Sequence, residues 1–278
     1  MRLAWNGFAL DLPPAWEVVA YLLDADKGEF RLNQRLELRG QLTWKRYKKA
    51  APDIARVLRD LHVRMCEQRL LGPEEPLVSE RAGWRVARGR AEVPRHAARW
   101  FAERKLLVHL VVDPQVLDSE LHTLLDSWST RTDQRTEHAM FGVRAVLPDA
   151  FTIEHLIARP GNVRLIASGP KMLTVTLRCI GLARHFVDGL QLEDFYGRLL
   201  RAEGSGVLSR QASTLRGLPG ATVVFRRAGE HAMEKVLGAF WKGTGLLWHD
   251  QAANRLYALE QIGPSRAKRL ELDDVVPR

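Results

Sequence analysis

The residues best suited to chemistry are nine histidines and two cysteines, which could bind a transition metal or serve as base and nucleophile. Zinc proteases place two histidines on one helical face as His-Glu-x-x-His, and structural zinc sites need closely spaced cysteine pairs. Neither pattern occurs in the sequence. The nearest groupings, Glu230-His231 and His249-Asp250, stand in turn-like surroundings and are expected to be solvated loops. The sequence therefore predicts no metal site and no cofactor.

Nucleophilic catalysis has no better support. Cys179 would need a histidine within hydrogen-bond reach, and the position of His185 in the sequence does not guarantee one. His62 is expected on the polar side of a helix, and His109 lies inside an apolar strand. The segments 204–206 and 243–245 lack the Gly-Lys-Ser/Thr ending of a phosphate-binding loop and are expected to be hairpin turns. We therefore expect no catalytic residues and a protein that is not an enzyme.

A basic segment gives the strongest remaining signal for a binding site. The net charge is +9, and the stretch from Lys27 to Lys105, with about 20 Lys/Arg and about 10 Asp/Glu, carries the excess. The candidate partner-binding residues are Trp44, Lys45, Arg46, Tyr47, Lys48, Lys49, Arg56 and Arg59.

Two interpretations of this basic segment are open. The cations could follow a phosphate backbone, with Trp44 and Tyr47 stacking on bases. Alternatively, the helical arginines form a solvated face on which interspersed acids such as Asp60 pair with them at i,i+3 or i,i+4 spacing. The interspersed acids favour the second interpretation.

The elements that would position these residues repeat along the chain. The segment 7–18 aligns with 142–153, so that a glycine, a Leu-Pro step, an alanine and the following aromatic residue all coincide. Further on, Thr43 and Lys45 align with Thr176 and Arg178. Matches spread along a whole unit indicate an internal duplication.

In each repeat, strands precede a helix and further strands follow it. Alternating residues such as those of 36–46 predict half-buried strands, and apolar residues at helical spacing predict a helix that begins at Pro52-Asp53. Further helices are expected over 113–128 and 190–202, and a charged tail over 266–278. The other expected strands are 8–12, 16–23, 29–32, 84–90, 96–103, 106–112, 143–147, 152–157, 163–167, 173–179, 221–226, 236–241, 246–248 and 255–261.

Hairpin connections between such strands produce a mostly antiparallel sheet. The predicted fold class is therefore α+β, with two tandem similar units, each a mostly antiparallel sheet with one or two packed helices. The first unit is expected over 1–130 and the second, its duplicate, over 139–278. A linker is expected over 131–138, because this stretch is rich in Thr, Arg, Asp and Gln without apolar periodicity.

A short motif supports this fold. Phe8, Leu10 and Leu12 form a first strand that ends in Pro13 and Trp16, and this "P-x-x-W" ending resembles the opening of the PsbP/Mog1-like α/β/α sandwich proteins. The resemblance covers about a dozen residues, and the second unit carries Phe151 in place of the tryptophan. It implies a domain of strands, helix, strands and helix, with a non-catalytic binding or assembly role.

The cysteines and the apolar segments of the sequence predict a cytoplasmic location. Cys66 and Cys179 lie far apart in the sequence and are expected to be reduced, buried thiols. The N-terminus has no apolar h-region of a signal peptide, and no apolar run approaches the roughly twenty residues of a membrane-spanning helix. We therefore expect a cytoplasmic protein without membrane contact.

Two functional hypotheses follow. The first is a non-enzymatic binding or assembly protein that uses a sheet face or the groove between the units to hold a macromolecular partner, namely another protein. Trp44, Trp84 and Trp100 are candidate contacts for it. The alternative is nucleic-acid or polyanion binding through the basic surface of the first unit, with an affinity that falls steeply as salt is added.

Overall fold

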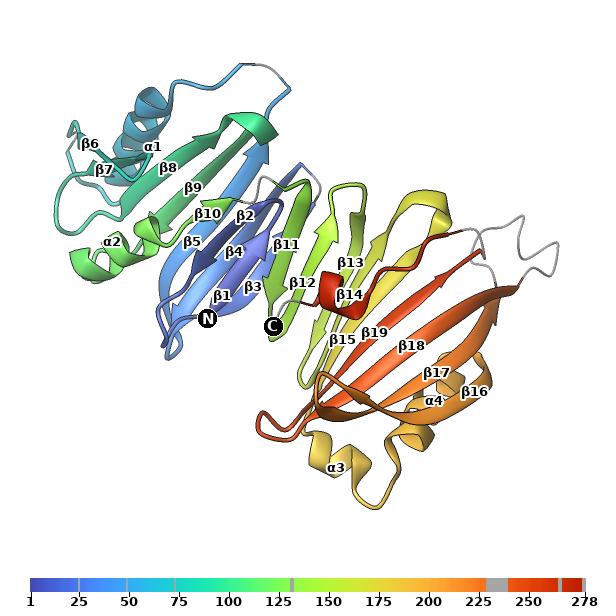
Figure 1. Ribbon diagram of the computed structural model, residues 1–278. Coiled ribbons are helices and arrows are strands. Elements are labelled where there is room, and N and C mark those ends of the chain that lie inside the picture. Colours follow the sequence, from blue (N-terminus) through green and yellow to red (C-terminus); the bar gives the residue numbers. More distant parts are fainter. Residues whose placement is uncertain are drawn as a thin grey trace. The chain divides into compact units, whose positions relative to one another are not determined.

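The computed structural model describes residues 1–24, 26–48, 50–72, 74–130, 133–228, 240–264 and 267–276. The chain divides into two compact units, Met1–Arg131 and Thr132–Arg278, which contain a large antiparallel sheet each and few helices (Figure 1). The α+β class predicted from the sequence is thereby confirmed.

The sheet of the first unit, called here the first sheet, has the strand order β3-β4-β5-β9-β8-β7-β6, and its described pairings are all antiparallel. Because β9 returns to lie between β5 and β8, strands β3 and β6 form the two edges. The strands are β3 (Glu17–Leu23), β4 (Lys27–Gln34), β5 (Glu37–Arg46), β6 (Leu77–Arg81), β7 (Trp84–Arg88), β8 (Arg95–Phe101) and β9 (Leu106–Val112), with the 3-10 helix η1 (Ala102–Arg104) before β9.

Helix α1 (Ile54–Gln68) connects β5 to β6 and packs on β7 and β8. It begins where the sequence predicts, because the side chain of Asp53 accepts a hydrogen bond of 3.1 Å from the backbone N–H of Arg56. Its buried residues, Leu58, His62 and Cys66, are spaced by four. The expectation that His62 lies on the polar side of the helix was wrong, since its imidazole continues the buried stripe.

An aromatic core occupies the opposite face of the first sheet. The hairpin of β1 (Arg2–Trp5) and β2 (Phe8–Asp11) contributes Phe8, whose ring centroid lies 5.8 Å from that of Trp44 and 5.2 Å from that of Trp128. Trp128 also packs edge-on against Trp84 at 4.6 Å. Trp44 and Trp84 are 2% and 0% exposed, so both side chains belong to the core.

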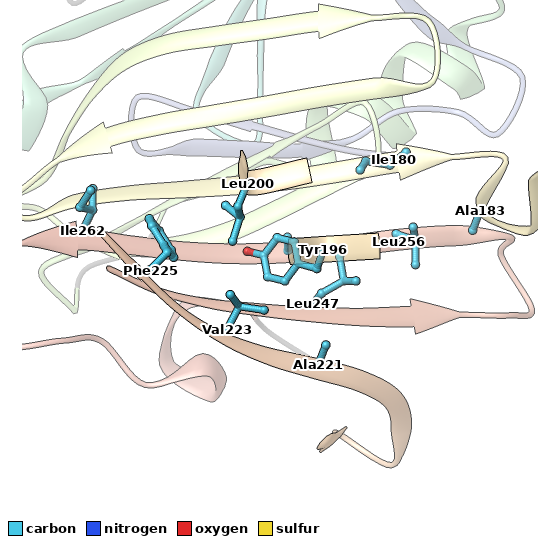
Figure 2. Packing of buried hydrophobic residues seen from close by; sticks show 11 residues of the cluster. Ile180, Ala183, Tyr196, Leu200, Ala221, Val223, Phe225, Leu247, Leu256 and Ile262 are labelled. Atoms are coloured by element: carbon cyan, nitrogen blue, oxygen red, sulfur yellow. The ribbon is translucent and has the colours of Figure 1, made fainter. Parts of the chain in front are cut away.

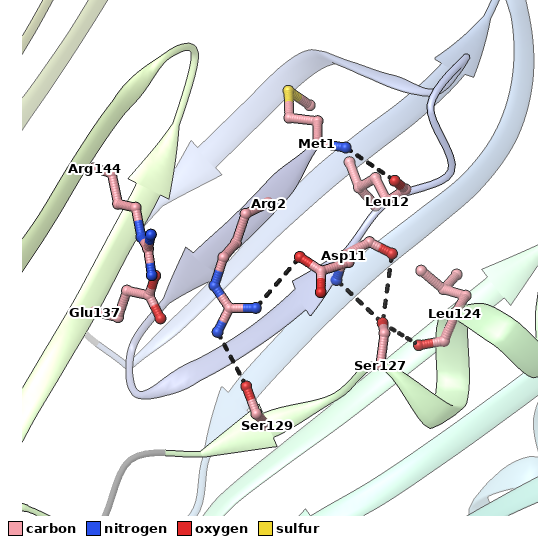
Figure 3. Close-up of polar contacts among 9 residues, drawn as sticks. All are labelled: Met1, Arg2, Asp11, Leu12, Leu124, Ser127, Ser129, Glu137 and Arg144. Carbon is pink, nitrogen blue, oxygen red and sulfur yellow. Dashed lines mark hydrogen bonds and ion pairs between the residues drawn. The ribbon is translucent and has the colours of Figure 1, made fainter. Parts of the chain in front are cut away.

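Polar contacts fix this hairpin to the segment that follows helix α2 (Asp118–Asp126), as Figure 3 shows. Arg2 donates to the Asp11 carboxylate (3.3 Å) and to the Ser129 hydroxyl (3.1 Å) in β10 (Ser129–Thr130), which pairs with β2. Ser127 accepts from the backbone N–H of Asp11 at 3.1 Å and donates to the carbonyl of Leu124 at 2.8 Å. The beginning and the end of the first unit are thus held together.

The sheet of the second unit, called here the second sheet, has the strand order β13-β14-β15-β19-β18-β17-β16. When the strands of each sheet are counted along the chain, this order is the same as in the first sheet. A hairpin again precedes the sheet, and helices again follow its third strand. The elements are β11 (Arg135–Met140), β12 (Val143–Pro148), β13 (Thr152–Arg159), β14 (Asn162–Ser168), η2 (Pro170–Met172), β15 (Thr174–Gly181), α3 (Ala183–Val187), α4 (Leu192–Ala202), β16 (Gly206–Leu215), β17 (Leu218–Ala228), β18 (Phe240–Asp250), β19 (Arg255–Gly263) and α6 (Leu272–Val275).

Helix α4 packs its buried side onto the middle of the second sheet (Figure 2). Tyr196 and Leu200 point from the helix toward Val223, Phe225 and Leu247, and all five side chains are 0% exposed. Burying a large apolar side chain contributes about 1.5–3 kcal/mol, so this cluster is the principal source of packing energy for α4.

Three sequence expectations for the second unit fail. His249-Asp250 is not a solvated loop but ends β18, where His249 is buried. Residues 243–245 are not a hairpin turn but lie inside β18, where a Cβ on Gly243 or Gly245 would come within 2.4 Å of Phe225 or Tyr196. The glycines therefore make room for rings that pack over the strand. Residues 135–138 of the expected linker belong to β11, whose polar residues have partners: Thr136 bonds Asp149 at 2.6 Å, for example. The expected linker's residues 131–132 lie outside the described ranges.

Two smaller observations complete the fold. Cys66 and Cys179 are both buried and outside any disulfide, as predicted. None of the helices in the described ranges combines the length and apolar character needed to cross a bilayer.

Candidate binding groove in the first unit

A groove lies on the α1 side of the first sheet. Because side chains alternate along a strand, Thr43 and Lys45 of β5 face this side together with their neighbours Leu107 and His109 on β9. Helix α1 packs on β7 and β8, and beside it a groove of about 360 Å³ opens over β4 and β5. Its lining residues are Leu22, Lys27, Gly28, Glu29, Thr43, Trp44, Lys45, Tyr47, Val57, Leu61, Leu107 and His109.

The groove combines an apolar wall with a cationic mouth. Val57 and Leu61 of α1 form the wall, one helical turn apart. Lys27 and Lys45 are exposed, and the ammonium of Lys45 lies 5.5 Å from the centroid of the Tyr47 ring. Such a cation–π contact contributes about 0.5–1 kcal/mol at an exposed site and holds the lysine in place. The site can therefore take an apolar group that is flanked by negative charge.

Strand β3 forms one rim of the groove and is also an edge of the sheet. It exposes Val19 and Leu22, at 48% and 62%, and a bulge between Val18 and Ala20 interrupts its pairing with β4. An exposed apolar edge strand is a template on which another extended chain can pair. Backbone hydrogen-bonding groups thus adjoin the groove.

The structure gathers part of the predicted site. Lys45 and Tyr47 line the groove, and Trp44 supports its floor with an indole that packs against Phe30 at 4.9 Å. Arg46 is exposed and lies 3.6 Å from the carboxylate of Asp26.

Three of the other predicted residues, Lys48, Arg56 and Arg59, do not line the groove. Lys48 is exposed, and Lys49 lies outside the described residues. Arg56 and Arg59 are exposed on α1, and Arg56 pairs with Asp60 at 4.0 Å, as the i,i+4 spacing predicts.

Sequence reasoning missed most of the lining because five separate elements contribute to it. Leu22, Glu29 and Leu61 come from β3, β4 and α1, and no local spacing connects them. One signal was available: the consecutive Val18-Val19 breaks the alternation expected of a strand with one face in water.

His109, which lines the groove, forms a pair with His96. The imidazoles of His96 and His109 stack with centroids 5.4 Å apart, and Nδ1 of His96 is 3.2 Å from Nε2 of His109. Burial, together with the neighbouring imidazole, lowers the pKa of His96 to about 3. Burial lowers the pKa of His109 to about 4. Both rings are therefore neutral at pH 7, and one ring can donate to the other.

The second unit carries a charged cluster on the α4 side of its sheet. The guanidinium of Arg178, 1% exposed, lies 2.8 Å from Glu203 at the end of α4 and 3.3 Å from Glu260 of β19. Burial raises the pKa of Glu260. Burial also opposes the ionisation of Glu203, but its hydrogen bond to Arg178 and the charge of that residue outweigh this and lower its pKa. The cluster is held by mutual neutralisation of its charges.

Comparison with known proteins gives a resemblance at the level of the fold. No family profile and no curated protein matches the chain. The solved structures that resemble it include cyanobacterial PsbP from Synechocystis, 10% identical over 49% of this chain and 86% of that chain, with a TM-score of 0.35.

A second similar structure is the type VI secretion immunity protein TplEi from Pseudomonas aeruginosa, solved with an "L" peptide. It is 12% identical, and the alignment covers 98% of this chain and 88% of that chain with a TM-score of 0.36. The resemblance to PsbP that the sequence motif predicts is thus found, weakly and for the fold alone.

Proposed function

We propose that the chain is a non-enzymatic binding protein whose first unit holds an extended segment of a partner protein in the groove beside α1. The observation that carries the proposal is the combination of an apolar groove of about 360 Å³ with an exposed apolar edge strand along its rim. A peptide that pairs with β3 would gain backbone hydrogen bonds from the strand and specificity from side chains placed in the groove.

The charge of the groove favours an acidic segment. Lys27 and Lys45 stand at its mouth, whereas its carboxylate, Glu29, is paired with Arg31 at 2.8 Å. An apolar side chain of the peptide would contact Val57 and Leu61, and flanking Asp or Glu residues would meet the two lysines. Binding of this kind requires no reactive group.

We also propose that the two units arose by duplication of one ancestor. The support for it is that both sheets have the same strand order and that a hairpin precedes each of them. A common order of seven strands is unlike a chance match between two hairpins.

Selection from a random peptide library displayed on phage, with the full chain as bait, tests the binding function. We expect selected peptides to alternate apolar and acidic residues, and their affinity to fall about tenfold or more in Leu22→Asp and in Lys45→Glu. Leu208→Asp is the matched control, because Leu208 is 54% exposed on β16, an edge strand of the second sheet.

Two outcomes would contradict the proposal. One is an absence of enriched peptides, or enriched peptides that bind Leu22→Asp as well as they bind the unaltered chain. The other is preferential binding of a short single-stranded DNA that weakens steeply with salt and is lost when Lys45 and Lys48 become glutamate. That second result would establish the polyanion alternative instead.

A further inference from the structure

We propose that His62, Cys66 and Glu74 form a binding site for a transition-metal ion of the zinc class. The site lies beneath α1, on the buried side of the helix, and the proposal does not depend on the function of the groove. His62 and Cys66 are one helical turn apart and both 0% exposed. Glu74 comes from the segment that follows the helix. One nitrogen, one sulfur and one oxygen thus converge within 4.8 Å of one another.

The separations of these atoms fit a shared ion. Nε2 of His62 lies 3.6 Å from Sγ of Cys66 and 3.8 Å from Oε2 of Glu74. Zinc binds sulfur at about 2.3 Å and nitrogen or oxygen at about 2.0 Å, so two ligands of one tetrahedral ion lie roughly 3.3–3.6 Å apart. A separation of 3.8 Å is too long for a hydrogen bond between imidazole and carboxylate. Small shifts of the side chains would bring all three atoms to bonding distance of one ion.

The surroundings keep this space open. A Cβ on Gly89 would lie 2.2 Å from Nε2 of His62 and 3.2 Å from Oε2 of Glu74, so any side chain at this position would fill the site. The backbone N–H of Arg90 donates to Oε2 of Glu74 at 3.1 Å, and its guanidinium lies 3.4 Å from the same oxygen. Outer contacts of this kind orient the carboxylates that bind metals.

The ligand set selects the class of ion. Calcium and magnesium prefer oxygen alone, whereas a thiolate, an imidazole and a carboxylate together suit zinc and similar borderline ions. Cys66 would bind as thiolate, and its proton would pass to solvent. The ion would connect α1 to the segment after it, beside Gly89, with one coordination position left over.

Titration of the untagged, reduced, chelator-treated chain with Co²⁺ tests the site, because cobalt bound to a thiolate gives a charge-transfer band in the near ultraviolet. We expect one equivalent of Co²⁺ to produce this band and Zn²⁺ to displace it. The thermal midpoint should rise with the concentration of Zn²⁺, since an ion that binds only the folded chain stabilises it.

Two variants and one control decide the assignment. Cys66→Ser should abolish the charge-transfer band, whereas Cys179→Ser, which removes the other buried thiol, should keep it. Glu74→Gln should weaken cobalt binding at least tenfold, and its side chain is 33% exposed, so the fold should tolerate the change.

Three results would overturn the site: no band in the unaltered chain, a band that survives Cys66→Ser, or one lost only in Cys179→Ser. Circular dichroism reports whether each variant folds. If Cys66→Ser does not fold, Glu74→Gln decides alone, and an unchanged cobalt affinity in that variant overturns the proposal.

Discussion

The polar side chains near the middle of the two sheets differ in charge between the two units. In the first, His109 lies opposite Thr43 and stacks on His96, so the polar groups are neutral. In the second, Glu260 lies opposite Thr176 and approaches Arg178, so the polar groups are ions. The same strand order therefore accommodates either a neutral pair or a charge network.

The extent of burial explains the difference. Arg178 and Glu260 are 2% exposed each, and at that depth an ion needs a partner within a few ångströms. Glu203 at the end of α4 supplies one, 2.8 Å from the guanidinium. Lys45, which the sequence aligns with Arg178, stands instead at the mouth of the groove in water. We infer that the covered cluster of the second unit maintains its fold, whereas the open face of the first is available to a partner.

The largest expected effect comes from removing the central cation of the network. In Arg178→Met, Glu260 stays buried and Glu203 half-buried, but both lose their closest counter-charge. Breaking one partner of a buried ion pair costs about 3–5 kcal/mol. Urea unfolding followed by circular dichroism should show a loss of this size, and hydrogen exchange should place it in the second unit.

Arg159→Met is the control for this change, because Arg159 is exposed on β13. It should alter the free energy of unfolding by no more than about 0.5 kcal/mol. A loss of less than 1 kcal/mol in Arg178→Met would mean that water already solvates the two carboxylates, and the contrast between the units would disappear.

Much of the framework could be predicted from the sequence, because strands and caps are local signals. A strand-length apolar run placed β9 correctly over Leu106–Val112, and Asp53 was recognisable as the start of α1.

What escaped prediction depends on contacts between distant segments. The sequence suggests that Gly245 is a turn residue, whereas in the structure Tyr196 packs over it. The sequence suggests that His62 lies on the polar side of its helix, whereas in the structure it lies beside Cys66 on the buried face of α1. The groove has no sequence signature of its own, since its wall, rim and floor come from a helix, an edge strand and the middle of the sheet.

The next largest expected effect is a dependence of the first unit's stability on pH. The pKa of His109 in the fold, about 4, lies below its ordinary value of 6.5. Its neutral form therefore contributes stability that is present above pH 6.5 and is lost as the pH falls toward 4. The loss should reach roughly 3 kcal/mol. In the second unit the pKa of Glu260 is raised and that of Glu203 is lowered, so their contributions to the pH dependence of stability have opposite signs.

Hydrogen exchange between pH 7 and 4, corrected for the intrinsic rates, measures the two units separately. Protection of β8 and β9 should fall faster than that of β18 and β19. His109→Leu should reduce this difference, whereas His155→Leu, a change on the exposed side of β13, should leave it intact. Equal acid sensitivity of the two sheets would show that the histidine pair does not set the response.

The smallest expected effect is a gain of stability rather than a loss. The hydroxyl of Tyr196 is buried against Gly245 and has no hydrogen-bond partner among the described residues. A buried hydroxyl without a partner costs free energy, so Tyr196→Phe should leave the stability unchanged or raise it by up to about 1 kcal/mol. Tyr257→Phe in β19 is the comparison, because the Tyr257 side chain bonds Arg255 and should lose stability when truncated. A loss of more than 1 kcal/mol in Tyr196→Phe would mean that the hydroxyl bonds an ordered water beside Glu260, and the second unit's cluster would then be hydrated rather than sealed by α4.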